Sequence, residues 1–151
     1  SRLQRGSRTI EVIYTPGHTA DSVSLVDKAS GYVFAGDFLV PDVNSEVTYG
    51  GRMGDYVQGV NSLLRTAPSK ARVFGAHRPI LGETSTVPAG IPEISMQDVR
   101  DMGAALESIR NGNMGGRGIF PVIYTINSTL ELWGNPPWLQ EWTPAYPQFD
   151  E

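Results

Sequence analysis

Two histidines and one aspartate of this chain stand where their side chains could bind a metal ion. His18 follows the turn signal Pro16-Gly17, while Asp37 and His77 each follow a short apolar segment. A fixed backbone at such strand-to-loop junctions can aim side chains into a cleft. A carboxylate at the end of a buried strand is costly to desolvate unless it is paired or bound to a cation. These residue types in these positions therefore favour metal ligation.

The elements that must position these residues begin with strands. Four segments carry the apolar, β-branched pattern of strands: 9–15, 22–26, 32–35 and 71–75. In the first of them, we expect Ile10 and Val12 to face the core, and the second and third form a hairpin. His18, Asp37 and His77 then follow strands at one edge of a sheet, so the three side chains are expected to converge.

Helical patterns occur twice. Asp55 is expected to cap one helix, and Ser95 is expected to cap a second helix that ends at Gly112. The run 119–132 has strand composition with a turn signal at Asn127-Ser128. Strands with interspersed helices predict a layered domain of the α/β (α+β) class.

Three stretches together resemble the later metal motifs of the metallo-β-lactamase superfamily, which includes glyoxalase II, lactonases and β-lactamases. They are Thr-Pro-Gly-His-Thr-Ala-Asp-Ser-Val-Ser-Leu, Tyr-Val-Phe-Ala-Gly-Asp and Phe-Gly-Ala-His-Arg-Pro, in the order that the family uses. The resemblance covers about residues 8–85. It implies a four-layer αββα sandwich, of which residues 1–151 supply the C-terminal half of a single domain, with 113–151 a C-terminal strand and an aromatic, proline-rich extension.

The resemblance also implies roles for individual residues. His18 would complete a three-histidine set on one metal, Asp37 would bridge both metals and position the activated water as the catalytic residue, and His77 would bind the second metal. The implied cofactors are two divalent metal ions, with zinc before iron or manganese. Arg78 could bind an anionic substrate group, with a solvent-facing arginine as the alternative, and Tyr49 beside Gly50-Gly51 could line the substrate cleft.

The earlier His-x-His-x-Asp-His motif of the family is absent from this chain. Two histidines and one aspartate cannot fill two sites, because a catalytic zinc normally takes three protein ligands. We therefore expect a partner, the missing N-terminal half of the same fold, to supply the remaining ligands. A metal-free interaction protein on a degenerate scaffold is the competing interpretation.

The predicted function is metal-dependent hydrolysis of a small-molecule ester, lactone, thioester, lactam or phosphoester. A di-iron oxidoreductase of the flavodiiron kind is the alternative from another enzyme class. The formal net charge of -4 and the pI of about 5.1 exclude the basic surface expected of a nucleic-acid-binding protein. No apolar run is long enough to predict a membrane span, and the absence of cysteine excludes disulfides and thiolate metal sites. Compartment and homo-oligomerisation stay open.

Overall fold

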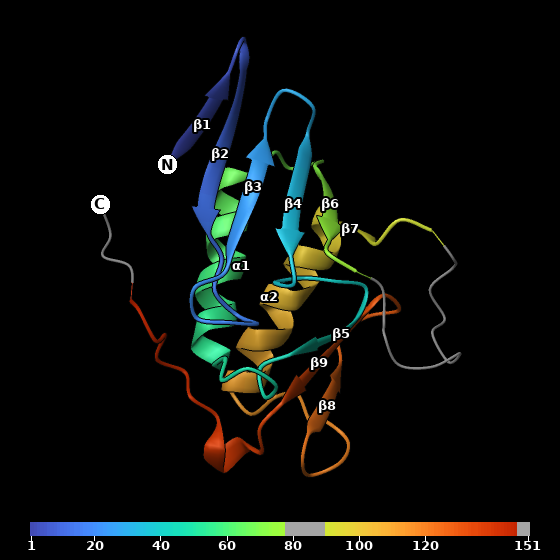
Figure 1. Ribbon diagram of the computed structural model, residues 1–151. Helices are drawn as coiled ribbons and strands as arrows, with labels where there is room; N and C mark the ends of the chain where they lie inside the picture. Colours follow the sequence, from blue (N-terminus) through green and yellow to red (C-terminus); the bar gives the residue numbers. More distant parts are fainter. Residues whose placement is uncertain (78–89, 148–151) are drawn as a thin grey trace.

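Residues 1–77 and 90–147, which this computed structural model describes, form two β-sheets and two α-helices in an α+β arrangement (Figure 1). The larger sheet contains, in spatial order, β1 (Arg2–Arg5), β2 (Arg8–Tyr14), β3 (Val23–Asp27), β4 (Tyr32–Gly36), β6 (Arg72–Gly75) and β7 (Glu93–Ser95). The smaller sheet contains β5 (Asp42–Ser45), β9 (Leu130–Gly134) and β8 (Val122–Thr125), and a 3-10 helix, η1 (Pro137–Leu139), follows it.

The four strands predicted before residue 77 are confirmed as β2, β3, β4 and β6, with bounds that differ by one residue or so. The predicted strand run at 119–132 is the β8–β9 hairpin. Its turn is held by Asn127, whose Oδ1 accepts the backbone N–H groups of Thr129 (2.8 Å) and Leu130 (2.9 Å). Strands β1, β5 and β7 were not predicted, because they are only three or four residues long and mostly polar.

Strands β2, β4 and β6 run in the same direction. β3 pairs antiparallel with both β2 and β4, and β4 pairs in parallel with β6. The carboxyl ends of β2, β4 and β6 therefore lie at one edge of the larger sheet, here called the carboxyl edge. A parallel pair needs a crossover connection, and the segment between β4 and β6 supplies it with β5 and α1 (Met53–Thr66).

The helices α1 and α2 (Met96–Arg110) pack side by side on one face of the larger sheet (Figure 1). Ser95 caps α2 as predicted, since its Oγ accepts the backbone N–H of Asp98 (3.1 Å) while Asp98 Oδ2 accepts that of Ser95 (2.8 Å). The chain leaves α2 through Gly112, whose φ of 73° suits glycine. Neither helix in the described part of the chain is both long and apolar enough to cross a membrane.

The predicted role of Asp55 as a helix cap is wrong. Helix α1 begins at Met53 after the N-cap residue Arg52, so Asp55 lies in its first turn. The side chain of Asp55 is turned instead toward the C-terminal segment, where Oδ1 accepts the backbone N–H of Ala145 (2.8 Å). A long-range contact of this kind leaves no local signal in the sequence.

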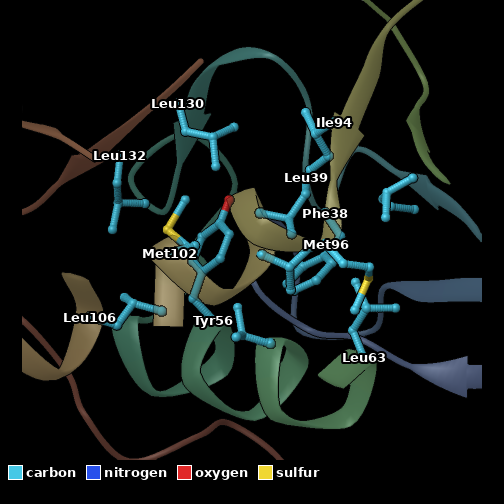
Figure 2. Close-up of a cluster of buried hydrophobic side chains, with 14 of the residues drawn as sticks. Phe38, Leu39, Tyr56, Leu63, Ile94, Met96, Met102, Leu106, Leu130 and Leu132 are labelled. Atoms are coloured by element: carbon cyan, nitrogen blue, oxygen red, sulfur yellow. The ribbon is translucent and has the colours of Figure 1, made fainter. Parts of the chain in front are cut away.

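The core lies between the larger sheet, the two helices and the smaller sheet (Figure 2). Phe38, directly after Asp37, stacks on Tyr56 of α1 with ring centroids 5.8 Å apart. Full burial of an aliphatic or aromatic side chain contributes about 1.5–3 kcal/mol. Side chains from both sheets and both helices share the cluster in Figure 2, among them Leu39, Leu63, Ile94, Met96, Met102, Leu106, Leu130 and Leu132.

The face of the larger sheet opposite the helices, here called the outer face, is also apolar. The register aligns one row of side chains across it: Val12, Leu25, Phe34 and Phe74. Figure 1 shows the helices behind the sheet. By the strand register Leu3, Val23 and Phe34 lie on the outer face, and all three are exposed.

The expectation that Ile10 and Val12 face the core is therefore wrong. Val12 pairs with Leu25 on the outer face, whereas Ile13 packs against the core. A strand with apolar side chains on both faces carries no alternation that distinguishes core from surface.

The exposed outer face predicts strong binding of a hydrophobic fluorescent dye by the chain. Replacing Val23 and Phe34 together by threonine should lower dye fluorescence, because it removes exposed apolar surface while placing a residue of high strand propensity at both positions. The unfolding free energy should change by about 0.5 kcal/mol for Val23→Thr. Phe34→Thr should cost about 0.5–1.5 kcal/mol more, because the Phe34 ring stacks on that of Phe74. The control Ile119→Thr removes an even more exposed apolar side chain outside the outer face. Equal losses of fluorescence in the control and the double variant would contradict the prediction.

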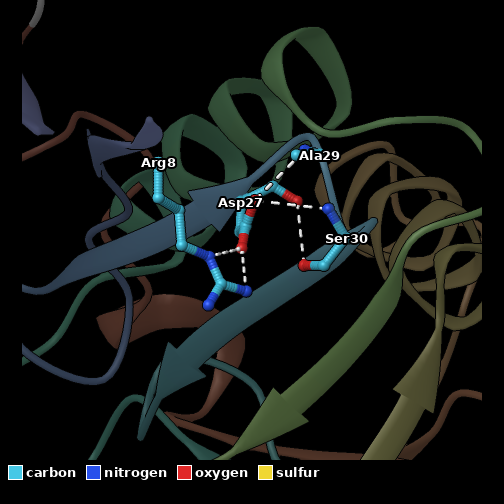
Figure 3. Close-up of polar contacts among 4 residues, drawn as sticks. All are labelled: Arg8, Asp27, Ala29 and Ser30. Carbon is cyan, nitrogen blue, oxygen red and sulfur yellow. Dashed lines mark hydrogen bonds and ion pairs between the residues drawn. The ribbon is translucent and has the colours of Figure 1, made fainter. Parts of the chain in front are cut away.

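The turn between β3 and β4 is built around Asp27, as Figure 3 shows. Its Oδ1 accepts the backbone N–H groups of Ala29 (3.1 Å) and Ser30 (3.3 Å), and its Oδ2 accepts Arg8 Nε (2.8 Å). Burial alone would raise the pKa of Asp27, but the hydrogen bonds from Arg8 and Ser30 outweigh it and hold the pKa below its usual value. Asp27 therefore joins the turn to β2 as a carboxylate.

The C-terminal segment packs across the amino end of α1. The backbone N–H of Gly54 donates to the carbonyl of Glu141 (3.0 Å), and Trp142 packs partly against the core. Asp55 is fully buried, and this burial raises its pKa, although the backbone N–H groups of Ala145 and Arg52 and the charge of Arg52 act in the opposite direction.

The raised pKa of Asp55 predicts the pH dependence of stability. The folded protein holds the Asp55 proton more tightly than the unfolded chain does. The stability that this proton contributes is therefore fully present below the ordinary pKa of about 3.9, and it is lost as pH rises through the pKa of Asp55 in the folded protein. Asp55→Asn should remove this loss. Urea unfolding from about pH 4 to pH 8 should therefore show the variant gaining stability relative to the native chain as pH rises. Parallel pH profiles of the two proteins would contradict the expectation.

Candidate metal centre

Asp37 and His77 lie together at the carboxyl edge. The backbone N–H of Ala76 donates to the carbonyl of Gly36 (2.8 Å), so the pairing of β4 with β6 continues to the residues next to both side chains. His77 Nε2 lies 3.1 Å from Asp37 Oδ1. The side chains are 43% and 46% exposed, respectively, so this pair of metal-ligand types is open to solvent and to further ligands.

The pair fits part of a metal-ligand set. Two atoms bound to one tetrahedral zinc at about 2.0–2.1 Å lie about 3.3 Å apart, which is close to the distance between His77 Nε2 and Asp37 Oδ1. Over residues 1–77 and 90–147, however, no group of three or more His, Asp or Glu side chains is placed to hold a metal ion. Asp37 and His77 can thus provide two ligands but not a complete set.

His18 lies on the loop that follows β2 at the same edge. The loop is ordered by hydrogen bonds from Gly17 N–H to the Thr19 carbonyl (3.1 Å) and from the Tyr14 hydroxyl to the Ala20 carbonyl. A Cβ on Gly17 would lie 2.9 Å from the Phe38 ring. Gly17 and Phe38, the residues next to His18 and Asp37, are therefore in contact. That His18 binds the same metal centre as Asp37 and His77 stays a prediction.

The segment 46–52, between β5 and α1, packs against the His18 loop and is here called the bracing loop. Its Tyr49 ring meets the His18 ring edge-on, with centroids 4.8 Å apart and planes at 61°. Tyr49 is largely exposed, so its predicted place beside a substrate cleft stays open to test. Arg78, the other predicted substrate-binding residue, lies outside the described residues.

The sequence analysis did not predict that two carboxylates near this region are buried. Glu46, at the start of the bracing loop, and Asp55 are 1% and 0% exposed, respectively. Burial raises the pKa of Glu46, although hydrogen bonds from Asn135 and the backbone of Met53 lower it in part. An acidic residue a few positions before Gly50-Gly51 is typical of a solvent-exposed loop. Only the long-range contact to Asn135 could have indicated that Glu46 is buried.

The close contact between the two loops predicts that Gly51 cannot carry a side chain. A Cβ on Gly51 would lie 2.2 Å from the backbone carbonyl oxygen of Gly17 and 3.2 Å from that of His18. Gly51→Ala should therefore displace the bracing loop and lower the unfolding free energy by about 1–3 kcal/mol. Gly115→Ala is the matched control, because a Cβ at Gly115 meets nothing within 4 Å. Equal urea-unfolding midpoints for the two variants would contradict the expected contact.

Comparison with known proteins relates part of this chain to a family. The model of the metallo-beta-lactamase superfamily matches residues 4–77, a segment that contains His18, Asp37 and His77. Residues 4–77 therefore match the metallo-β-lactamase superfamily, and the chain is a fragment of its fold. Its two helices and mixed sheets form part of the metallo-β-lactamase fold.

Solved structures of similar fold share low sequence identity with the chain. ETHE1 from Myxococcus xanthus is 21% identical, with 76% of this chain and 50% of that one covered at a TM-score of 0.52. The BLEG-1 B3 metallo-beta-lactamase is 23% identical (70% and 44% covered, TM-score 0.47). A metallo-beta-lactamase from Staphylococcus aureus subsp. aureus COL is 22% identical (71% and 33% covered, TM-score 0.46).

The chain thus spans half of the length of ETHE1 and less than half of the other two proteins. At these identities the likeness concerns the fold alone. Comparison with curated proteins gave no match.

Proposed function

We propose that the chain contributes His18, Asp37 and His77 to the two-metal site of a hydrolase that acts on an ester, lactone, thioester, lactam or phosphoester. The observation that carries this proposal is the Asp37–His77 pair at the carboxyl edge, in a superfamily that includes metal-dependent hydrolases. Two divalent ions, with zinc as the first candidate, would lower the pKa of a bound water toward neutrality and polarise the bond under attack.

Each residue has a distinct part in this proposal. Asp37 supplies the negative charge, and its two carboxylate oxygens can face two cations at once. His77 and His18 supply neutral imidazole nitrogens. The backbone pairing of Gly36 with Ala76 sets the positions from which Asp37 and His77 project.

The remaining ligands are proposed to come from the other half of the same fold. The outer face is the surface on which that half would pack, because it is apolar and carries exposed Leu3, Val23 and Phe34. Residues 1–151 would then form the C-terminal half of one domain. This arrangement accounts together for the incomplete ligand set and for the exposed apolar surface.

The experiment that tests the function is the metal content of the assembled protein with Asp37→Asn. The change keeps the shape of the side chain but removes its charge, so bound metal should fall from about two equivalents toward about one, with loss of hydrolysis. Elemental analysis measures the metal and identifies it as zinc, iron or manganese. Asp21→Asn is the control, since Asp21 is an exposed acid on the neighbouring His18 loop. Unchanged metal content in Asp37→Asn, with only lower thermal stability, would remove Asp37 from the site.

A further inference from the structure

Glu46 is a buried acid whose carboxylate joins three separate parts of the chain. It begins the bracing loop, and its Oε1 accepts the backbone N–H of Asn135, just after β9, at 2.6 Å. The backbone of Met53, the first residue of α1, also hydrogen-bonds to this carboxylate. One side chain thus connects the start of the bracing loop with the helix at its far end and with the smaller sheet.

These contacts close the bracing loop at both ends. At its start, the backbone N–H of Glu46 donates to the carbonyl of Trp133 (3.1 Å), and Ser45 Oγ lies 2.8 Å from Thr48 Oγ1. At its end, the Glu46 carboxylate meets Met53. The loop is therefore held as a closed unit.

The bracing loop packs directly against the segment that carries His18. The Tyr49 ring lies edge-on against the His18 ring, and Gly51 lies so close to the Gly17 carbonyl that no Cβ fits between them. A Cβ on Gly51 would also lie 3.2 Å from the backbone carbonyl oxygen of Glu46. Displacement of the loop end would therefore release both contacts to the His18 segment.

We propose that Glu46 is a positioning residue that fixes the His18 imidazole by holding the bracing loop closed. The inference rests on the proposed function in so far as His18 is a metal ligand. Glu46 touches no reacting group in this account and acts only through Tyr49 and Gly51.

The chemistry of a carboxylate suits this role. Both of its oxygens accept, so it can receive two backbone N–H groups from different directions. A buried charge is costly to desolvate, and the two amides offset part of that cost. Glutamine has nearly the same shape but replaces one acceptor oxygen with a donor NH₂ group, which would face a backbone N–H.

The test is Glu46→Gln in the full chain, with NMR of the histidine ring signals as the readout. The chain has two histidines, so His77 serves as an internal reference for His18. Tyr49→Leu first establishes how far the His18 signals move when the neighbouring ring is absent. In Glu46→Gln, the His18 signals should move in the same direction as in Tyr49→Leu, while the His77 signals stay in place.

A matched control separates positioning from general destabilisation. Asp27 is also a buried carboxylate that accepts backbone N–H groups, but it lies at the β3–β4 turn, at the opposite edge of the sheet. Asp27→Asn should leave the His18 signals unchanged. If Glu46→Gln does not fold, Glu46→Asp is the second variant, because it keeps the charge but shortens its reach by one methylene. The same movement of the His18 signals alone is expected for it.

Two outcomes would overturn the inference: unchanged His18 signals in Glu46→Gln, or equal movement of the His18 and His77 signals. The measurement needs no metal, so it fails or succeeds separately from the proposed function. If the His18 signals move in Glu46→Gln while the metal content of Asp37→Asn is unchanged, Glu46 still holds His18 in place. The proposed metal chemistry at Asp37 would then be wrong.

Discussion

The parallel pairing of β4 with β6 is the constraint on which the rest of this structure depends. Neighbouring parallel strands end at the same edge, so Asp37 and His77 meet although the chain between them contains β5 and α1. The crossover must also return across the sheet, and it does so by burying the apolar side of α1 against it. One backbone pairing thus brings Asp37 and His77 together and also accounts for a large part of the core.

The incomplete ligand set and the apolar outer face are two aspects of one arrangement. Asp37 and His77 would provide two ligands where a catalytic zinc takes three, and the outer face carries exposed apolar side chains where a layered fold has a covering layer. The chain spans half of the length of ETHE1 from Myxococcus xanthus, whose fold it shares in part. The proposed second half of the domain would supply the missing ligands at the carboxyl edge and would cover the outer face.

Much of the fold and of the candidate site followed from local sequence signals. The Ser95 cap was predictable because a capping box lies within four residues, and the positions of Asp37 and His77 followed from the strands before them. The contacts of Glu46 and Asp55 were not predictable, because their partners Asn135 and Ala145 are about 90 residues away. The prediction of which β2 side chains face the core was wrong. Both faces of the sheet are apolar, so the alternation of apolar and polar residues does not show which face is buried.

Apolar side chains on both faces of the larger sheet also weaken the specification of its register. A slip by one residue would normally expose a whole hydrophobic row and bury a polar one, but in β2 to β4 the penalty is smaller because either face accepts apolar side chains. The polar contacts between strands then decide the alignment. Thr15 Oγ1 lies 2.6 Å from Ser24 Oγ in a fully buried pair, and Arg8 is paired with Asp27. These four residues, none of which is a proposed metal ligand, select the one strand alignment that sets the relative positions of His18 and Asp37.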